Sequence, residues 1–425
     1  MSISPALVKP RPSRPVAHVA AAAAAVLVAA AGCAPRAATA PQVLTPIRLD
    51  VASVVGAEAP TGTPGSPDPF QTFSALQGGN GVEWPAPTRV RGASGAPGPD
   101  YWQQRADYSI QATLDTAAGG SVRGAVTLRY TNNSPDTLRF LWLQLDQNLY
   151  RPGSKGSALF PADSRWGVRG FRGGYDLSAV TVDGRPVAPR VDDTMMRLDL
   201  AEPLAPRGGR ATVAMQFRFA VPEHGSDRMG RDGTLFEIAQ WYPRAAVYDD
   251  VRGWNTDPYL GQGEFYLEYG DIDYSVTAPA GYVIAGSGVL QNAEQVLTAE
   301  QRARLARART LVAQPGRPET VAQVITESEA AAARGAAVPG TRTWRFRAAN
   351  VRDVAWAGAP DFRWDATSWN GVACHAYYQS PRAGRAWESA AEQTCWSMRT
   401  YSTLVYPYPY PQATSVAGPV GGMEY

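Results

Sequence analysis

A two-residue alternation of apolar and polar side chains is the feature that most constrains the fold of this 425-residue chain. The alternation is clearest in two segments, whose apolar residues share one parity: Val122, Val126, Leu128 and Tyr130, then Val213, Met215, Phe217 and Phe219. Successive side chains of a β-strand point to opposite faces, so this period predicts half-buried strands. Turn sequences such as Asp183-Gly184 separate the strands. Several strands at this spacing predict an antiparallel sandwich or a large twisted sheet.

The segment Leu138–Leu145 is apolar on both parities. We therefore expect a central strand that is covered on both faces. Helical signals interrupt the strands between about residues 297 and 335, where Thr298 and Gln301 have the spacing of a capping box. Strand signals return at Thr343–Ala348, so these helices are expected to decorate the surface between two strands.

The character of the chain changes after Asp365. Val372–Tyr378 is expected to form a strand, Arg385–Leu404 a long helix, and Ala413–Ala417 a short strand. Between this helix and the short strand, the alternating Tyr and Pro residues of Tyr406–Pro411 enforce an extended loop. The expected helix carries these residues on one face: Trp387, Ala391, Thr394, Met398 and Tyr401. This strand–helix–strand order predicts the start of a second domain.

The N-terminus resembles an export signal. Basic residues precede the apolar run Ala20–Ala31, which is too short for a comfortable membrane span. The run leads into Cys33 in a sequence that resembles the bacterial lipobox, in which the cysteine is lipidated. We expect a lipoprotein anchored through Cys33, and the alternative is a plain secretory signal with an incidental cysteine. The residues after Cys33 favour the outer membrane, with the folded part facing the periplasm. Residues 34–100 are rich in Pro, Gly and Ala and are expected to form a largely disordered tether.

Charge and short motifs exclude several classes of function. The net charge of +2 provides no bulk field for nucleic acid. The sequence contains no His-Glu-x-x-His, no Walker-type phosphate loop and no Gly-x-Ser-x-Gly elbow. Cys374 and Cys395 are expected to form a disulfide or to remain two buried thiols. His375 beside Cys374 cannot form a tetrahedral zinc site alone, because adjacent residues project in different directions.

Ordered motifs resemble the aminopeptidase N family of zinc peptidases, family M1. They are Tyr101–Tyr108, Phe236–Asp250, Gly253-Trp254-Asn255, Gly263-Glu264-Phe265-Tyr266 with Asp271–Tyr274, and the closing Gly421-Gly422-Met423-Glu424. The last is similar to the family's Gly-x-Met-Glu-Asn signature, with Tyr425 in place of the usual Asn. Several motifs in the family's order, from about Asp100 to Tyr425, make the resemblance specific.

The resemblance implies a mainly β fold in which a saddle-like antiparallel β-sandwich precedes the start of an α/β thermolysin-like domain. The implied organisation is a signal peptide at 1–33, the tether at 34–100, the β domain with its helical insertion at 101–365, and the incomplete peptidase domain at 366–425. The alternative is a non-catalytic β-sandwich lipoprotein with a binding or structural role.

The resemblance also implies how a peptide is held. Gly421, Gly422 and Met423 belong to an edge strand to which an extended peptide adds. The carboxylate of Glu424 holds the peptide's α-ammonium, and the alternative is a solvated carboxylate at a strand end. Gln240 matches a second position against that ammonium, and the alternative is a buried amide that hydrogen-bonds loop backbone. Zinc is expected in the full-length protein, with no catalytic or metal-ligating residue in these 425 residues. The chain alone is therefore expected to bind peptides and the membrane, and to hydrolyse nothing.

Overall fold

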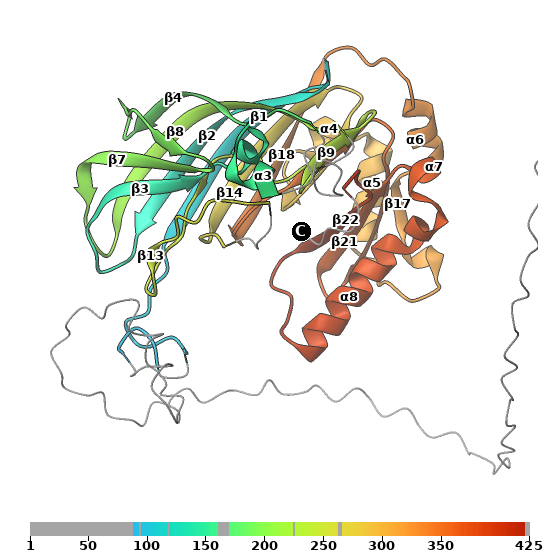
Figure 1. Cartoon of the computed structure of the whole chain (residues 1–425). Coiled ribbons are helices and arrows are strands. Elements are labelled where there is room, and N and C mark those ends of the chain that lie inside the picture. Colours follow the sequence, from blue (N-terminus) through green and yellow to red (C-terminus); the bar gives the residue numbers. More distant parts are fainter. Residues whose placement is uncertain are drawn as a thin grey trace, which may run out of the picture. The chain divides into compact units, whose positions relative to one another are not determined.

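The computed structural model describes residues 88–92, 95–117, 119–159, 170–223, 226–261 and 266–420, which belong to one compact unit (Figure 1). Within these residues the mainly β prediction is confirmed, because strands form five sheets and helices are few. The expected signal peptide, Cys33 and the closing segment 421–425 lie outside the described residues.

The largest sheet has eight strands. Their order is β16 (Val289–Leu290), β18 (Thr341–Val351), β14 (Gly270–Pro279), β1 (Arg105–Asp115), β2 (Ser121–Asn132), β8 (Gly209–Ala220), β4 (Asp176–Val182) and β5 (Arg185–Pro186). The apolar parity of β2 and β8 is buried, so the predicted alternation is confirmed. Neighbouring strands are antiparallel except β1 and β14, which run parallel. Asp183 and Gly184, both with positive φ, form the turn between β4 and β5.

Three smaller sheets accompany it. One contains β15 (Val283–Gly286), β19 (Trp356–Ala359), β10 (Leu235–Ile238) and β9 (Met229–Asp232); one contains β11 (Arg244–Ala245), β3 (Leu138–Gln144), β7 (Met195–Leu204) and β6 (Arg190–Asp192); and one pairs β12 (Tyr248–Asp249) with β13 (Gly253–Trp254). Strand β3 is central, as expected, but only one of its faces is fully buried. On the other face the Arg197 guanidinium covers the Phe140 ring at 3.9 Å from its centroid, so an amphipathic side chain replaces a second apolar layer.

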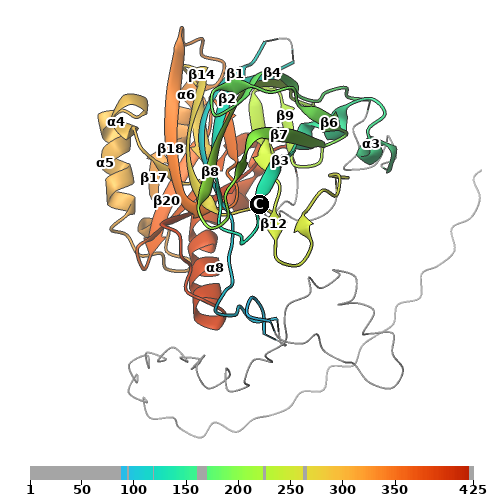
Figure 2. The ribbon, with the colours of Figure 1, turned by 90° about the vertical axis from the view of Figure 1, so that its left-hand side faces the viewer.

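The last sheet has the order β17 (Ala322–Ile325), β20 (Arg363–Trp369), β21 (Val372–Tyr378) and β22 (Gln412–Val416). Strands β21 and β22 run parallel, and the helix α8 (Ala390–Leu404) connects them. It packs on β21 and β22, which Figure 1 labels beside it, and on β20, which Figure 2 labels above it. The predicted strand–helix–strand order is therefore confirmed. The expected helix face is partly wrong: Ala391 is buried, whereas Tyr401 is 63% exposed near the end of α8.

Several short helices complete the described chain. They are the 3-10 turns η2 (Asp146–Tyr150), η3 (Pro318–Thr320) and η4 (Arg385–Ser389), and the α-helices α3 (Lys155–Leu159), α4 (Ala293–Val296), α5 (Ala299–Ala308), α6 (Glu327–Ala333) and α7 (Ser380–Ala383). The capping box of Thr298 and Gln301 at the start of α5 is confirmed.

The helical insertion at about residues 297–335 was expected to decorate the surface, and this prediction is wrong. Helix α5 packs on β17 and β20, and α6 packs on β20. The insertion also supplies β17, which pairs with β20. It is therefore part of the α/β layer, because Leu305 and Ala330 bury their side chains in the core beside that sheet.

Order begins before Tyr101, where the tether was expected to end. The segment from Thr88 forms a bridge between Arg91 and Pro97. The Arg91 side chain also forms an ion pair of 2.5 Å with Asp250, whose side chain is 8% exposed. A long-range pair of this kind cannot be recognised from composition, which is why the segment looked disordered.

Candidate functional site

The open edge of β22 is the first element of the candidate site. Strand β22 ends its sheet and pairs with β21 on one side. On the other side no strand pairs with it in the described part of the chain. Residues 412–418 line a groove of about 1290 Å³ that also takes residues from the ends of β15, β16 and β18 and from the Tyr408–Pro411 loop. An extended segment in this groove could use the unpaired N–H and C=O groups of β22.

Glu237 forms the second element. It belongs to β10 and lines the same groove. Its Oε2 accepts a hydrogen bond of 3.0 Å from the backbone N–H of Val420. A Cβ atom at Gly418 would lie 1.8 Å from that oxygen, so only glycine allows this approach. The carboxylate thus anchors the segment that leads into Gly421-Gly422-Met423-Glu424, which lies outside the described residues.

Sequence reasoning missed Glu237. The available signal was a single carboxylate within the apolar run Leu235–Ala239, where a charge requires a partner. The partner, Val420, is 183 residues away, and the contact could not be anticipated from a short motif.

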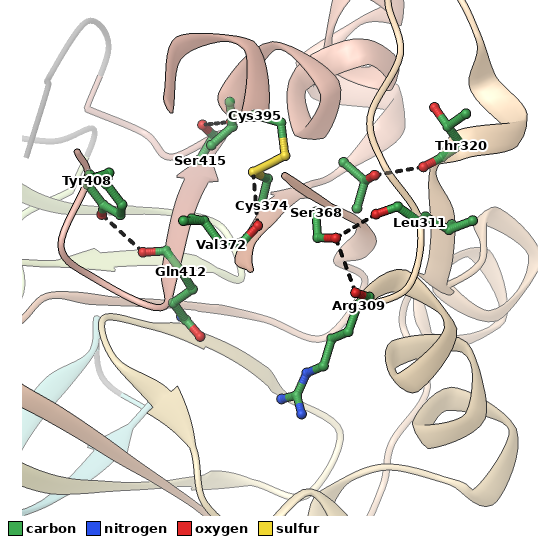
Figure 3. The surroundings of a disulfide bond; sticks show 12 residues. Arg309, Leu311, Thr320, Ser368, Val372, Cys374, Cys395, Tyr408, Gln412 and Ser415 are labelled. Atoms are coloured by element: carbon green, nitrogen blue, oxygen red, sulfur yellow. Dashed lines mark hydrogen bonds between the residues drawn. A yellow bond between two sulfur atoms is a disulfide. The ribbon is translucent and has the colours of Figure 1, made fainter. Parts of the chain in front are cut away.

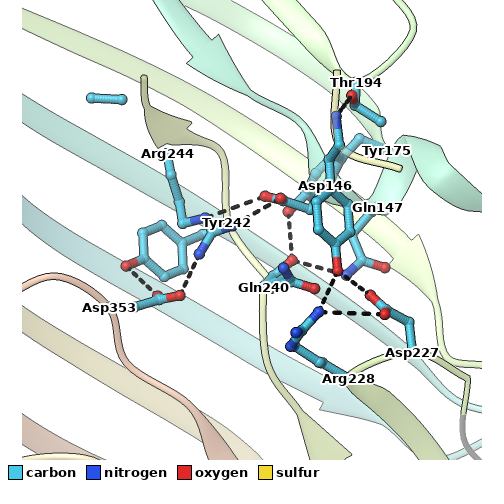
Figure 4. Close-up of polar contacts among 12 residues, drawn as sticks. Asp146, Gln147, Tyr175, Thr194, Asp227, Arg228, Gln240, Tyr242, Arg244 and Asp353 are labelled. Carbon is cyan, nitrogen blue, oxygen red and sulfur yellow. Dashed lines mark hydrogen bonds and ion pairs between the residues drawn. The ribbon is translucent and has the colours of Figure 1, made fainter. Parts of the chain in front are cut away.

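Gln240 follows β10 and is 4% exposed. Its backbone has φ of 51°, a conformation that few residues other than glycine adopt. Its carbonyl accepts hydrogen bonds from Gln147 Nε2 at 2.8 Å and from the Tyr175 hydroxyl at 3.4 Å (Figure 4). Glu237 lines the groove, whereas Gln240 is not among the lining residues. A contact between Gln240 and a peptide therefore stays a prediction.

A buried ionic cluster holds the loop after Gln240. Arg244 lies 2.8 Å from Asp146 and also pairs with Asp353, which accepts a hydrogen bond of 2.8 Å from the Tyr242 hydroxyl (Figure 4). Burial raises the pKa of Asp146 and Arg244 opposes that effect. Burial alone would lower the pKa of Arg244, but the two carboxylates raise it overall, so the guanidinium stays charged. These contacts hold the loop after Gln240 in place.

A second buried group lies beside this cluster. The Tyr259 hydroxyl donates to Asp227 at 2.5 Å and accepts from Arg228 Nη1 at 2.7 Å. Burial raises the pKa of Asp227 to about 6, with the hydrogen bond from Tyr259 and the charge of Arg228 opposing it. His224, three residues earlier, is outside the described residues.

Cys374 and Cys395 are joined as a disulfide between β21 and α8 (Figure 3). The neighbouring His375 is buried, and its Nδ1 accepts a hydrogen bond of 3.2 Å from Trp364 Nε1. Burial lowers its pKa to about 4, with Arg309 adding a smaller effect. Among the described residues no three His, Cys, Asp or Glu side chains gather to hold a metal ion. The described residues therefore do not fit a catalytic zinc. The described part of the chain also contains no helix long and apolar enough to cross a membrane.

The described residues combine an eight-stranded sheet and smaller β-sheets with a layer of helices packed on the sheet of β17, β20, β21 and β22. No protein-family profile and no curated protein matches the sequence. Among solved structures, the chain is similar to an M1 zinc metallopeptidase from Deinococcus radiodurans at 13% identity and a TM-score of 0.43, over 76% of this chain and 57% of that one. A mutant of that enzyme bound to a Tyr-Ser-Ala substrate matches at 14% identity and a TM-score of 0.41, over 76% and 58%. The chain thus spans less than two thirds of these structures.

Proposed function

We propose that the chain is the peptide-binding N-terminal part of a zinc-dependent aminopeptidase of the aminopeptidase N family. One observation carries the proposal. The open edge of β22 faces a groove, and the segment anchored by Glu237 leads from that strand directly into Gly421-Gly422-Met423-Glu424. The signature sequence thus begins shortly after a strand that no other described strand pairs on one side, and we propose that it continues this edge.

The edge would bind a peptide through its backbone. An extended substrate adds to an exposed strand by main-chain hydrogen bonds, which are independent of side-chain identity. Gly421 and Gly422 remove side chains from the path of that approach. The groove has room for such a segment, at about 1290 Å³.

The carboxylate of Glu424 would fix the register. A charge-assisted contact between Glu424 and the α-ammonium holds only a peptide that has a free N-terminus, which restricts cleavage to the first bond. Gln240 is proposed as a second contact to the same ammonium. Glu237 has a different role, because its carboxylate already accepts the Val420 N–H.

The zinc ion would be held by residues outside this chain. No His-Glu-x-x-His occurs in the 425 residues. Peptide binding and hydrolysis are therefore proposed to be separable, and the chain alone binds without cleaving. The proposal also includes export, lipidation at Cys33 and attachment to the outer membrane facing the periplasm. A Cys33→Ser variant should then leave the membrane fraction, whereas retention there would contradict the anchor.

The test is a titration of the whole chain with a free tripeptide such as Leu-Gly-Gly and with its N-acetylated form, followed by calorimetry. The free peptide should bind at least about tenfold more tightly, because acetylation removes the charge. Glu424→Gln should abolish the difference. Glu202→Gln, which changes an exposed carboxylate on β7, should not alter it.

A second candidate is a non-catalytic lipoprotein that uses its β-sandwich for binding or structure. Equal binding of free and acetylated peptides, or no peptide binding, would favour it over the aminopeptidase.

A further inference from the structure

The solvent face of the eight-stranded sheet carries a hollow that the proposed peptidase does not use. The hollow measures about 700 Å³ and lies over β4, β8, β2, β1, β14 and β18, whose order can be followed in Figure 1. It is distinct from the groove beside β22, with which it shares no lining residue. Along each strand, its polar side chains alternate with the buried ones and point to the face away from the hydrophobic core.

Three arginines give the hollow its charge. Arg123 and Arg218 lie directly opposite each other on β2 and β8, and Arg345 lies on β18. None of the three forms an ion pair with another described residue. Like charges in direct cross-strand register repel each other. One nearby carboxylate, Asp176, lies opposite Arg218 and leaves the set with net positive charge.

Hydroxyl and amide groups occupy the space between the arginines. Thr113 lies opposite Arg123, and the next row places Gln111 between Ala125 and Ser275. Further polar lining residues are Ser178, Gln216, Thr277 and Thr343. These side chains both donate and accept hydrogen bonds. Small residues such as Ala125 leave the floor open between longer side chains.

We infer that this hollow binds an acidic oligosaccharide, one that carries carboxylates along a hydroxyl-rich chain. The planar guanidinium groups match carboxylates in bidentate geometry. The hydroxyl and amide groups match sugar hydroxyls. Strands β2 and β18 are three strand spacings apart, about 14 Å at the usual separation. A ligand that reaches both Arg123 and Arg345 therefore needs several sugar units.

Other polymeric ligands fit this surface less well. Single-stranded nucleic acid requires aromatic side chains for base stacking, and the hollow's aromatic lining residue, Phe217, is only 3% exposed. An extended peptide requires an unpaired strand edge, whereas the central strands of this sheet are paired on both sides.

The test uses the whole chain and three probes: oligogalacturonate, a neutral malto-oligosaccharide of equal length, and oligothymidylate. Calorimetry should show oligogalacturonate binding that weakens as salt increases. The Arg123→Gln/Arg218→Gln variant should bind more than about tenfold more weakly, because two charge-assisted contacts are lost. The Arg139→Gln variant, changed at an exposed arginine on β3, should bind like the wild type.

The expected result also includes weaker binding by Arg123→Lys/Arg218→Lys, which keeps the charge but loses the planar fork. Arg345→Gln probes the other end of the hollow if the double variants fold poorly. Equal binding of the neutral glycan would overturn the inference, as would equal binding of oligothymidylate or unchanged affinity in the Arg123 and Arg345 variants.

Discussion

His375 should make the folded state sensitive to acid. The imidazole is buried between β-strands, and its Nδ1 accepts a hydrogen bond from Trp364. A protonated Nδ1 could not accept that bond, and burial disfavours the charged ring. The pKa of His375 is accordingly lowered from 6.5 to about 4.

The size and direction of the effect follow from this pKa. A difference of about 2.5 pH units corresponds to about 3 kcal/mol of unfolding free energy. Because the folded pKa lies below the unfolded one, the unfolded state takes up the proton first as pH falls. The stabilisation is therefore fully present above pH 6.5 and is lost as pH falls from 6.5 to about 4.

Two buried carboxyl groups change the unfolding free energy with pH in the opposite direction to His375. Burial raises the pKa of Glu268 to about 7 and that of Asp227 to about 6. Their contribution to the unfolding free energy is fully present below the pKa values of the unfolded chain. It is lost as pH rises through the pKa values of the folded state. A comparison of two variants that both retain them cancels this term.

The assay is urea unfolding of the whole chain and of His375→Asn between pH 4 and pH 8. Asn keeps an acceptor for Trp364 but does not titrate. The wild type should lose about 3 kcal/mol relative to the variant on going from pH 7 to pH 4. A difference between the two proteins that stays constant with pH would show that the His375 pKa is unshifted and that this residue does not make the folded state sensitive to acid.

Three further predictions concern stability and use the same unfolding assay. Gly418→Ala should destabilise the chain by about 1–2 kcal/mol, because its Cβ displaces the Glu237 carboxylate, and Glu237→Ala should remove most of that cost. Loss of the disulfide in Cys374→Ser should cost about 3 kcal/mol for a sequence separation of 21 residues, and a reducing agent should have the same effect on the wild type only. Arg244→Met should cost about 3–5 kcal/mol, since it leaves Asp146 buried without its counter-charge.

Each has an outcome that would contradict it. Additive effects of the Gly418 and Glu237 changes would show that the two residues do not interact. An unchanged unfolding midpoint in Cys374→Ser would show that the bridge does not restrict the unfolded chain. Asp146→Asn should partly rescue Arg244→Met, and further destabilisation instead would contradict the charge argument.

Local patterns predicted local structure well. The alternation in β2 and β8 identified both strands and their buried faces, and the Thr298–Gln301 pair identified the start of α5. These signals depend on neighbouring residues, whose geometry the backbone fixes.

Long-range pairings escaped prediction. The parallel pairing of β1 with β14 joins Tyr108 to Ile272, and periodicity contains no information about which strands pair. The role of the insertion was missed for the same reason. Its helical sequence signals do not indicate that the insertion also contains β17 or that β17 pairs with β20.

The candidate site was predictable in part. The Gly421–Glu424 motif was found from its resemblance, and the strand before it, β22, was expected at nearly its observed bounds. Glu237 was not found, because its role depends on a fold that brings β10 to Val420. The ion pair of Arg91 with Asp250 was not predicted either, because it also depends on a fold that brings distant residues together.

We have proposed that these residues form the peptide-binding part of a zinc aminopeptidase. The most direct test is the nucleotide sequence beyond codon 425 of the gene. If the proposal holds, the reading frame stays open there and encodes His-Glu-x-x-His within roughly 20 to 40 residues, as the family pattern implies. A stop codon at that point, followed by unrelated sequence, would contradict it.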